Sequence, residues 1–187
     1  RAAFLGRVFQ DPMMGTAPTM QIEENLALAA RRGQPRGLKW GITALERADY
    51  RELLKTLDLG LEDRLTAKVG LLSGGQRQAL TLLMASLKQP KLLLLDEHTA
   101  AVDPKTADKV LALSDQIVQE NNLTTLMITH NMKDAIAHGN RLIMMDAGRV
   151  VVDISGEDKK KLTVPDLLAL FSRASGSDEA NDKMLLS

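Results

Sequence analysis

The strongest constraint on the fold is a run of four leucines, Leu92 to Leu95, that leads directly into Asp96 and Glu97. An unbroken apolar run of this length is typical of a strand covered on both faces in a parallel sheet. Strand-like and helix-like segments alternate after Ser73, and this alternation favours an α/β fold with a mostly parallel sheet. Ligands bind such sheets at the carboxyl ends of the strands, so we expect the acid pair at a binding edge.

Periodicity and end signals set the other expected elements. Strands are expected at 4–9, 92–95 and 126–129, a hairpin at 141–154, and helices near Thr19, after the Thr43–Glu46 capping box, at 76–88, 104–120 and 132–138, and after Thr163. The helix after Thr43 is expected to bury Leu45, Ala48, Leu53, Leu54 and Leu57. We expect 31–41 to be a surface loop, 159–161 a solvated basic triplet, and the polar stretch beyond Ser172 to be flexible.

Composition limits the function classes. Lysine plus arginine equals aspartate plus glutamate, 24 against 24, so the chain has no basic field to attract nucleic acid or anionic lipid. No apolar run approaches the ~20 residues that cross a bilayer, so a membrane role requires a partner. The chain has no cysteine and therefore no disulfides, which is neutral to mildly in favour of a reducing cytosol. A length of 187 residues suits one ordinary domain.

Asp96 and Glu97 are the main candidates for chemistry. An aspartate at the end of a buried strand can hold Mg²⁺, and an adjacent glutamate can orient and deprotonate an attacking water. The alternative is an acidic strand end with no chemical task. The apolar run before the pair and the motifs near it favour the chemical role.

A second candidate site is the turn Ser73-Gly74-Gly75, which opens the helix expected at 76–88. The serine can cap this helix, and the glycines let backbone amides approach a phosphate at the positive end of the helix dipole. Such a turn is more often only a cap. Its place one short helix before the acid pair favours phosphate binding.

Ordered motifs in the chain resemble those of the nucleotide-binding subunits of ATP-binding cassette (ABC) transporters. They are Val8–Pro12 (Q-loop), Leu72–Gln78 (signature), Leu92–Glu97 (Walker B with its glutamate), Ala101–Asp103 (D-loop) and Ile128–His130 (H-loop). The resemblance runs to about Ile154 and more loosely favours a bacterial importer-type group. It implies a P-loop NTPase core of the ABC ATPase type plus an α-helical subdomain.

The resemblance implies catalytic roles, with ATP and Mg²⁺ as cofactors. Asp96 would hold the metal, and Glu97 would be the general base. Gln10 would contact the metal and the attacking water and move with membrane subunits. His130 would contact the γ-phosphate as a switch, although without the other motifs it would more simply be a satisfied histidine at a strand end.

The resemblance also implies a dimer. Two subunits would pair head to tail, so that Ser73, Gly74, Gly75 and Gln76 bind ATP held by the partner. Asp103 would cap a helix and communicate across the dimer. We expect one partial ABC ATPase domain, with a helical signature subdomain at about 11–88, a core formed by 1–10 and 89–155, and a C-terminal helix and tail at 156–187.

No phosphate-binding loop of the form G-x-x-x-x-G-K-[ST] occurs, because none of the 13 glycines precedes a lysine. In the family this loop lies upstream of the Q-loop, on a strand that we expect beside 92–95. We therefore expect a lost N-terminal portion, an exposed apolar edge and face on the sheet, and a chain that alone binds ATP poorly and does not hydrolyse it.

His98 stands where the family usually carries proline. The histidine changes the stiffness of the loop or adds a titratable group near the site. From the sequence we expect the His98→Pro change to affect turnover little.

The leading interpretation is the ATPase subunit of an ABC transporter. An importer is favoured over an exporter. The implied partners of this chain are a second ATPase subunit, transmembrane permease subunits and a solute-binding protein. The chain itself would lie at the cytoplasmic face of the membrane. The segment 10–73 would dock the permease, with Met13 and Met14 either as contacts or as ordinary core residues. Alternatives are a regulatory module without catalysis, and an ABC-type ATPase acting on nucleic acid or the ribosome. Only the basic loop around Trp40 favours the latter, so no nucleic-acid partner is expected.

Overall fold

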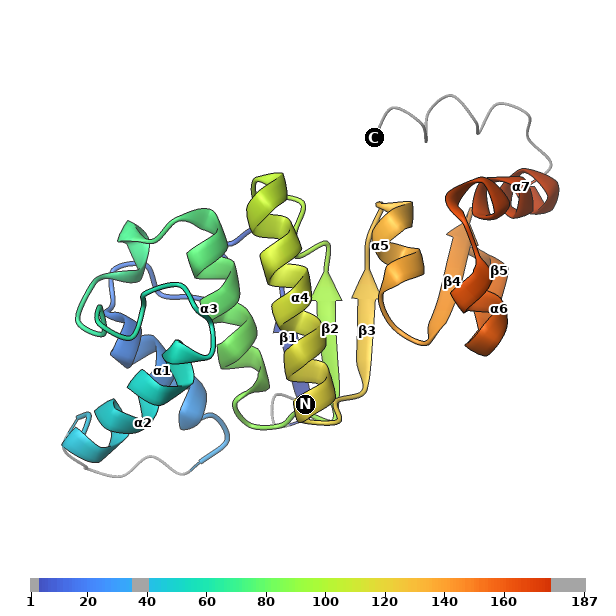
Figure 1. Ribbon diagram of the computed structural model, residues 1–187. Coiled ribbons are helices and arrows are strands. Elements are labelled where there is room, and N and C mark those ends of the chain that lie inside the picture. Colours follow the sequence, from blue (N-terminus) through green and yellow to red (C-terminus); the bar gives the residue numbers. More distant parts are fainter. Residues whose placement is uncertain (1–3, 35–40, 176–187) are drawn as a thin grey trace. The chain divides into compact units, whose positions relative to one another are not determined.

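The computed structural model describes residues 4–34 and 41–175, and Figure 1 shows the order of its elements. The chain forms two compact units, Arg1–Ile128 and Thr129–Ser187. The first unit contains β1 (Leu5–Val8), α1 (Ile22–Ala30), α2 (Ala44–Lys55), a short 3₁₀ helix (Val69–Leu71), α3 (Gly74–Ser86), β2 (Leu92–Asp96), α4 (Pro104–Glu120) and β3 (Thr125–Ile128). The second contains α5 (Met132–Ala137), β4 (Arg141–Asp146), β5 (Arg149–Ser155), α6 (Gly156–Lys161) and α7 (Val164–Ser175). The α/β class is confirmed, and the finer division into subdomains stays a prediction.

The first unit is built on a parallel sheet in the order β1-β2-β3. Leu95 lies between Val8 on one side and Met127 on the other, so β2 is the central strand. Both sides of β2 carry hydrogen-bonded neighbours, so the strand expected directly beside 92–95 has no free side of β2 to pair with, and an exposed edge of the sheet stays a prediction.

The two faces of the sheet are covered unequally by the described residues of the first unit. Leu93 and Leu95 are buried, whereas Leu92 and Leu94, which point to the other face, are only half-buried. The expectation of a strand covered on both faces is wrong for these residues, because the buried side packs in one core with α3 and α4, while no described helix of the first unit forms such a layer on the opposite side.

The uncovered face is apolar. Leu5, Leu126 and Ile128 are 37%, 51% and 51% exposed, and their register partners on β2 lie on the same face. This confirms the expectation of an exposed apolar face on the sheet.

The start of α1 differs from the prediction. The helix begins at Ile22 after the N-cap Gln21, whose N–H donates to the Glu24 carboxylate at 2.7 Å, so Thr19 is not the cap. The amides of Ile22 and Glu23 donate to Ala67 and Leu65 carbonyls at 3.0 Å each. These long-range bonds fix the start of the helix, and no local sequence signal predicts them.

The Thr43–Glu46 capping box and the start of α2 are as predicted, but the buried face is different. Leu54 and Leu57 are buried, whereas Leu45 is 72% exposed and Ala48 is also exposed. Tyr50, which was not on the expected face, is buried. The helix is rotated about its axis relative to the pattern because an aromatic side chain fills the core.

In the second unit the hairpin is as predicted. Its turn contains Ala147 and Gly148, both with positive φ (45° and 79°), as a two-residue turn requires.

The expectation of a solvated basic triplet at 159–161 is wrong at Lys159, which is 3% exposed. Its ammonium donates to His138 O at 2.9 Å and to Ile136 O at the end of α5, and burial lowers its pKa. Thr163 caps α7 as predicted, and α7 extends to Ser175; the tail beyond lies outside the described residues.

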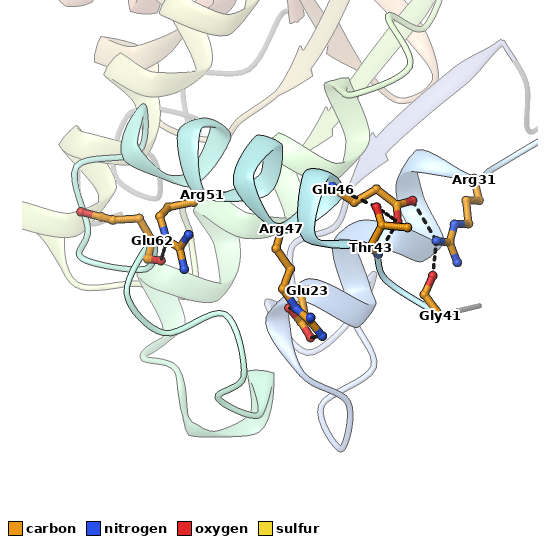
Figure 2. Close-up of polar contacts among 8 residues, drawn as sticks. All are labelled: Glu23, Arg31, Gly41, Thr43, Glu46, Arg47, Arg51 and Glu62. Carbon is orange, nitrogen blue, oxygen red and sulfur yellow. Dashed lines mark hydrogen bonds and ion pairs between the residues drawn. The ribbon is translucent and has the colours of Figure 1, made fainter. Parts of the chain in front are cut away.

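Ion pairs join α1 to α2, as Figure 2 shows. Arg47 binds the buried Glu23 carboxylate with two bonds of 2.7 and 3.0 Å. Arg31 donates to Glu46 at 2.8 Å and to Gly41 O at 2.7 Å. The Thr43 backbone N–H, and next the Arg31 guanidinium, lower the pKa of the Glu46 carboxyl to about 2.

We predict that Glu46→Ala lowers Tm at pH 7 by about 2–4 °C, the effect of losing a cap worth about 1 kcal/mol. Because the folded pKa of Glu46 lies below its ordinary value of 4.5, the carboxylate contributes fully above about pH 4.5. Its contribution is lost as the pH falls towards 2. Thermal unfolding followed by circular dichroism from pH 2 to 7 checks this, with Glu52→Ala as the control on the same helix. An equal Tm difference at both pH extremes would contradict it.

Candidate functional site

The acid pair lies at the carboxyl end of the central strand. Asp96 is the last residue of β2, and Glu97 begins the turn that leads to α4. Because β1 is parallel to β2, Gln10, which follows β1, reaches the same edge. The Gln10 amide Nε2 donates to Glu97 Oε2 at 3.0 Å, so the structure brings these two predicted site residues together.

Arg7 on β1 is a site residue that the sequence analysis missed. Its Nη2 donates to Asp96 Oδ2 at 2.6 Å, and its guanidinium lies 4.6 Å from the centroid of the Phe9 ring. Both charged side chains are partly exposed, so the pair contributes little to stability. The effect of the pair is electrostatic, because the positive charge of the Arg7 guanidinium offsets the negative charge of the Asp96 carboxylate. The sequence feature that could have pointed to Arg7 is its single charge within the apolar run 4–9.

The donors at this edge fit a magnesium–nucleotide site better than a site for a bare cation. Over 4–34 and 41–175, no three His, Cys, Asp or Glu side chains gather as metal ligands. Mg²⁺ in phosphoryl-transfer sites is usually held by one or two carboxylates together with substrate phosphates. The Asp96 carboxylate and the Gln10 amide oxygen are hard donors of this kind.

The backbone of Glu97 is held in a rare conformation. Its φ is +43°, in the left-handed region that residues other than glycine seldom adopt. Glu97 N donates to Ile128 O at 2.9 Å, and Ala100 N donates to Glu97 O at 3.0 Å. The adjacent strand and the following turn therefore both restrain the peptide that carries the predicted base.

His98 is buried, at 2% exposure, with Nε2 2.9 Å from Ser114 Oγ on α4. From the sequence, His98 was expected to change the stiffness of the loop or to add a titratable group, and Ser114 was not expected as its partner. Proline would delete the bond to Ser114 but would restrain the same backbone position through its ring, so little effect of His98→Pro on turnover stays a prediction.

The signature turn caps α3, as predicted. Ser73 Oγ accepts from Gln76 N at 3.2 Å, and Gln76 Oε1 accepts from Ser73 N at 3.2 Å. Ser73 and Gly74 are exposed, whereas Gly75 is buried. Gln76 Nε2 also donates to Leu59 O at 3.3 Å, which ties the turn to the segment after α2.

The two glycines of this turn differ in their surroundings. A Cβ on Gly75 would lie 1.9 Å from Thr106 Cγ2 in the first turn of α4, so packing within the chain requires glycine there. A Cβ on Gly74 would meet Val102 Cγ1 at 3.6 Å, an ordinary contact. Within the described residues, packing therefore does not require glycine at 74.

The D-loop aspartate is at the same edge. Asp103 caps α4 and accepts from Thr106 N at 3.1 Å, and the Thr106 hydroxyl, followed by its N–H, lowers the pKa of Asp103. Since Thr106 also packs on Gly75, the starts of α3 and α4 lie together at the carboxyl end of β2. Sequence reasoning missed Thr106, although it is the third residue after the cap.

Buried polar side chains of α3 contact the segment that carries Gln10. Gln78 Nε2 donates to Phe9 O at 2.9 Å, and Gln78 is fully buried. The Arg77 guanidinium donates to Gly70 O at 3.1 Å and contacts Met13 Sδ. The helix that begins with the signature turn is therefore bonded to the residue before Gln10. His130 lies in the second unit, two residues after β3, and its role stays a prediction.

A parallel sheet whose central strand ends in an acid pair, with a capped glycine turn at the same edge, defines the class of ABC-type ATP-binding proteins. Residues 2–100 match the family model described as "ABC transporter", and the chain belongs to this family. It is 49% identical over 174 residues to a tyrosine transport ATP-binding protein of Clostridioides difficile (strain R20291), covering 93% of this chain and 69% of that protein. It is 34% identical over 186 residues to the methionine import ATP-binding protein MetN of Streptococcus pneumoniae (strain ATCC BAA-255 / R6), covering 96% of this chain and 48% of that one.

Solved structures have the same fold. A dimeric ATP-binding cassette in a post-hydrolysis state, bound to ADP and Pi, aligns with a TM-score of 0.65 at 30% identity, over 81% of this chain and 62% of that chain. The cbiO1 protein of Clostridium perfringens, part of the ABC transporter complex cbiONQ, aligns with a TM-score of 0.69 at 20% identity, over 98% and 67%, which supports the fold alone. None of the described helices is both long and apolar enough to span a bilayer.

We predict that Gly75→Ala lowers the free energy of unfolding by about 1–3 kcal/mol, because the added methyl overpacks against Thr106. Gly74→Ala is expected to leave it unchanged or raise it by up to about 1 kcal/mol, since alanine favours a helix. Urea unfolding of the chain measures both.

The double variant Gly75→Ala/Thr106→Ser removes the colliding methyl and keeps the hydroxyl, so it is expected to restore most of the loss. A destabilisation by Gly74→Ala equal to that by Gly75→Ala would refute the packing difference between the two glycines.

Proposed function

We propose that this chain is the ATP-hydrolysing part of an ABC transporter subunit that drives solute import. The observation that carries the proposal is the Gln10–Glu97 bond of 3.0 Å beside Asp96 at the carboxyl edge of the sheet. This bond supports the proposal because a carboxylate that can act as a base, a second carboxylate that can hold a metal and an amide that can orient the base lie close together, as phosphoryl transfer to water requires.

In the proposed reaction each residue has a separate task. Asp96 would hold Mg²⁺ in place of its ion pair with Arg7, and the bound metal would supply charge neutralisation at the phosphates. Glu97 accepts the proton of the attacking water. Gln10 keeps the Glu97 carboxylate oriented, and His130 contacts the γ-phosphate. The loop that cradles the phosphates, with its lysine, comes from outside these 187 residues.

The signature turn binds the nucleotide of a partner subunit. Ser73 and Gly74 are exposed at the start of a 13-residue helix, where backbone N–H groups favour an anion. Head-to-tail pairing makes closure of the dimer depend on the γ-phosphate, and hydrolysis releases it. This arrangement is supported by Gly74, which is exposed directly after the cap and has no described neighbour that a Cβ would collide with.

Coupling to permease subunits follows from the contacts around Gln10. Met13 and Met14, three and four residues beyond it, are each 51% exposed, which favours the docking role over core packing. Gln78 bonds to Phe9 O, so a displacement at this segment is passed to the helix of the signature turn.

The partners we propose are transmembrane permease subunits, which the chain meets at the cytoplasmic face of the membrane, and a solute-binding protein. They, and not this chain, choose the solute. The tyrosine and methionine transport relatives make amino acids the first solutes to test.

The test is Glu97→Gln in the complete protein. ATP hydrolysis is expected to fall by at least about 100-fold, the contribution of a general base, whereas ATP-dependent dimerisation persists. Phosphate release and light scattering measure the two. Glu120→Gln, an exposed carboxylate-to-amide change on α4, is the matched control. Turnover that survives Glu97→Gln would exclude Glu97 as the base.

Gly74→Ala tests the signature turn separately. The added methyl keeps the backbone amides from the phosphate, so ATP-dependent dimerisation is expected to weaken by about tenfold or more while the fold keeps its stability. Light scattering over a series of protein concentrations measures the change. Unaltered dimerisation in this variant would show that the turn does not contact nucleotide.

A further inference from the structure

A buried imidazole directly follows the proposed catalytic base. His98 is 2% exposed and Ser114 is 3% exposed, and their polar atoms lie 2.9 Å apart. Ser114 is on the buried side of α4, next to Leu113 and one turn before Ile117, so its position is fixed by the core. The residue after Glu97 is therefore anchored to a rigid helix.

Ser114 Oγ lies within hydrogen-bond distance of two groups, His98 Nε2 at 2.9 Å and Val110 O at 2.8 Å. When the hydroxyl proton points to Val110 O, the serine oxygen accepts from the Nε2-protonated imidazole, and in the other tautomer the imidazole accepts that proton. Both tautomers make the bond between His98 and Ser114. Removal of either side chain deletes this buried hydrogen bond, which is costly.

The anchor adjoins the strained peptide. Glu97 has φ +43°, and such a conformation persists only where the surroundings over-determine it. The bond to Ile128 restrains the strand side, and the bond from Ala100 restrains the turn. His98 adds a third restraint through its side chain. Together these direct the Glu97 carboxylate towards Gln10.

We propose that His98 is a positioning residue that, through its hydrogen bond to Ser114, holds Glu97 in the geometry needed for general-base catalysis. The proposal rests on the proposed function of Glu97. The family usually fixes this position with the ring of proline, whereas this chain fixes it with a side-chain bond to α4. The role needs no change of protonation at His98.

The test compares His98→Leu, Ser114→Ala and His98→Gln in the complete protein. His98→Leu and Ser114→Ala are each expected to lower kcat by about 10- to 100-fold, the effect of a small misplacement of the base, with KM for ATP within about twofold. The glutamine Nε2–H reaches nearly as far as the imidazole Nε2–H, so His98→Gln is expected to recover most of kcat. The double variant His98→Leu/Ser114→Ala is expected to be no slower than the slower single variant, because both remove one interaction.

Ser86→Ala is the matched control, since Ser86 is also buried and its hydroxyl donates to a helix carbonyl, Leu83 O, at 2.9 Å. It is expected to lose stability without losing kcat. As a measurement that does not depend on turnover, the ¹³Cα and ¹³Cβ shifts of Glu97 are expected to move away from left-handed values in His98→Leu and to return in His98→Gln.

The proposal is overturned if His98→Leu keeps both kcat and the Glu97 shifts, or if His98→Gln is as slow as His98→Leu. Glu97→Gln in the same assay separates the two levels. If Glu97→Gln abolishes turnover and His98→Leu does not lower it, only the positioning role is wrong. If Glu97→Gln keeps turnover, Glu97 is not the base, and the part of the proposed function on which the positioning role rests is wrong.

Discussion

The pairing of β2 between β1 and β3 is the interaction on which the rest of the structure depends. It sets Leu95 beside Val8 and Met127, and so fixes the ends of all three strands at one edge. Every predicted site residue of the first unit reaches this edge because a strand ends there or a helix begins there. A slip by one residue would exchange the buried Leu93 and Leu95 for their half-buried neighbours and turn the acid pair away.

Close packing between α3 and α4 joins the other half of the site to this edge. Gly75 lies against Thr106, and Thr106 in turn bonds to the cap of α4, Asp103. The position of the signature turn is therefore set by its packing against α4. The position of α4 is in turn set by the turn that leads from the acid pair. In contrast, the uncovered face of the sheet, with Leu126 and Ile128 exposed, has no layer from the described residues.

Local signals predicted the elements and the motifs well. The four leucines predicted β2, the Thr43–Glu46 pair predicted the start of α2, and Asp103 with Pro104 predicted the start of α4. The errors arose where distant residues decide. Ile22 is held by a carbonyl of the segment 65–67, and Lys159 is buried under the end of α5, far from it in the sequence.

The sequence by itself determined the chemistry available: a carboxylate pair after a buried strand, a serine–glycine helix cap, and the order of motifs of the ABC family. These depend on residue identity and on short spacing, which are local properties. Only the tertiary structure decided which groups meet. The pairs Arg7–Asp96, Gln10–Glu97 and His98–Ser114 depend on strand register and helix packing, because the two residues of each pair are distant in the sequence.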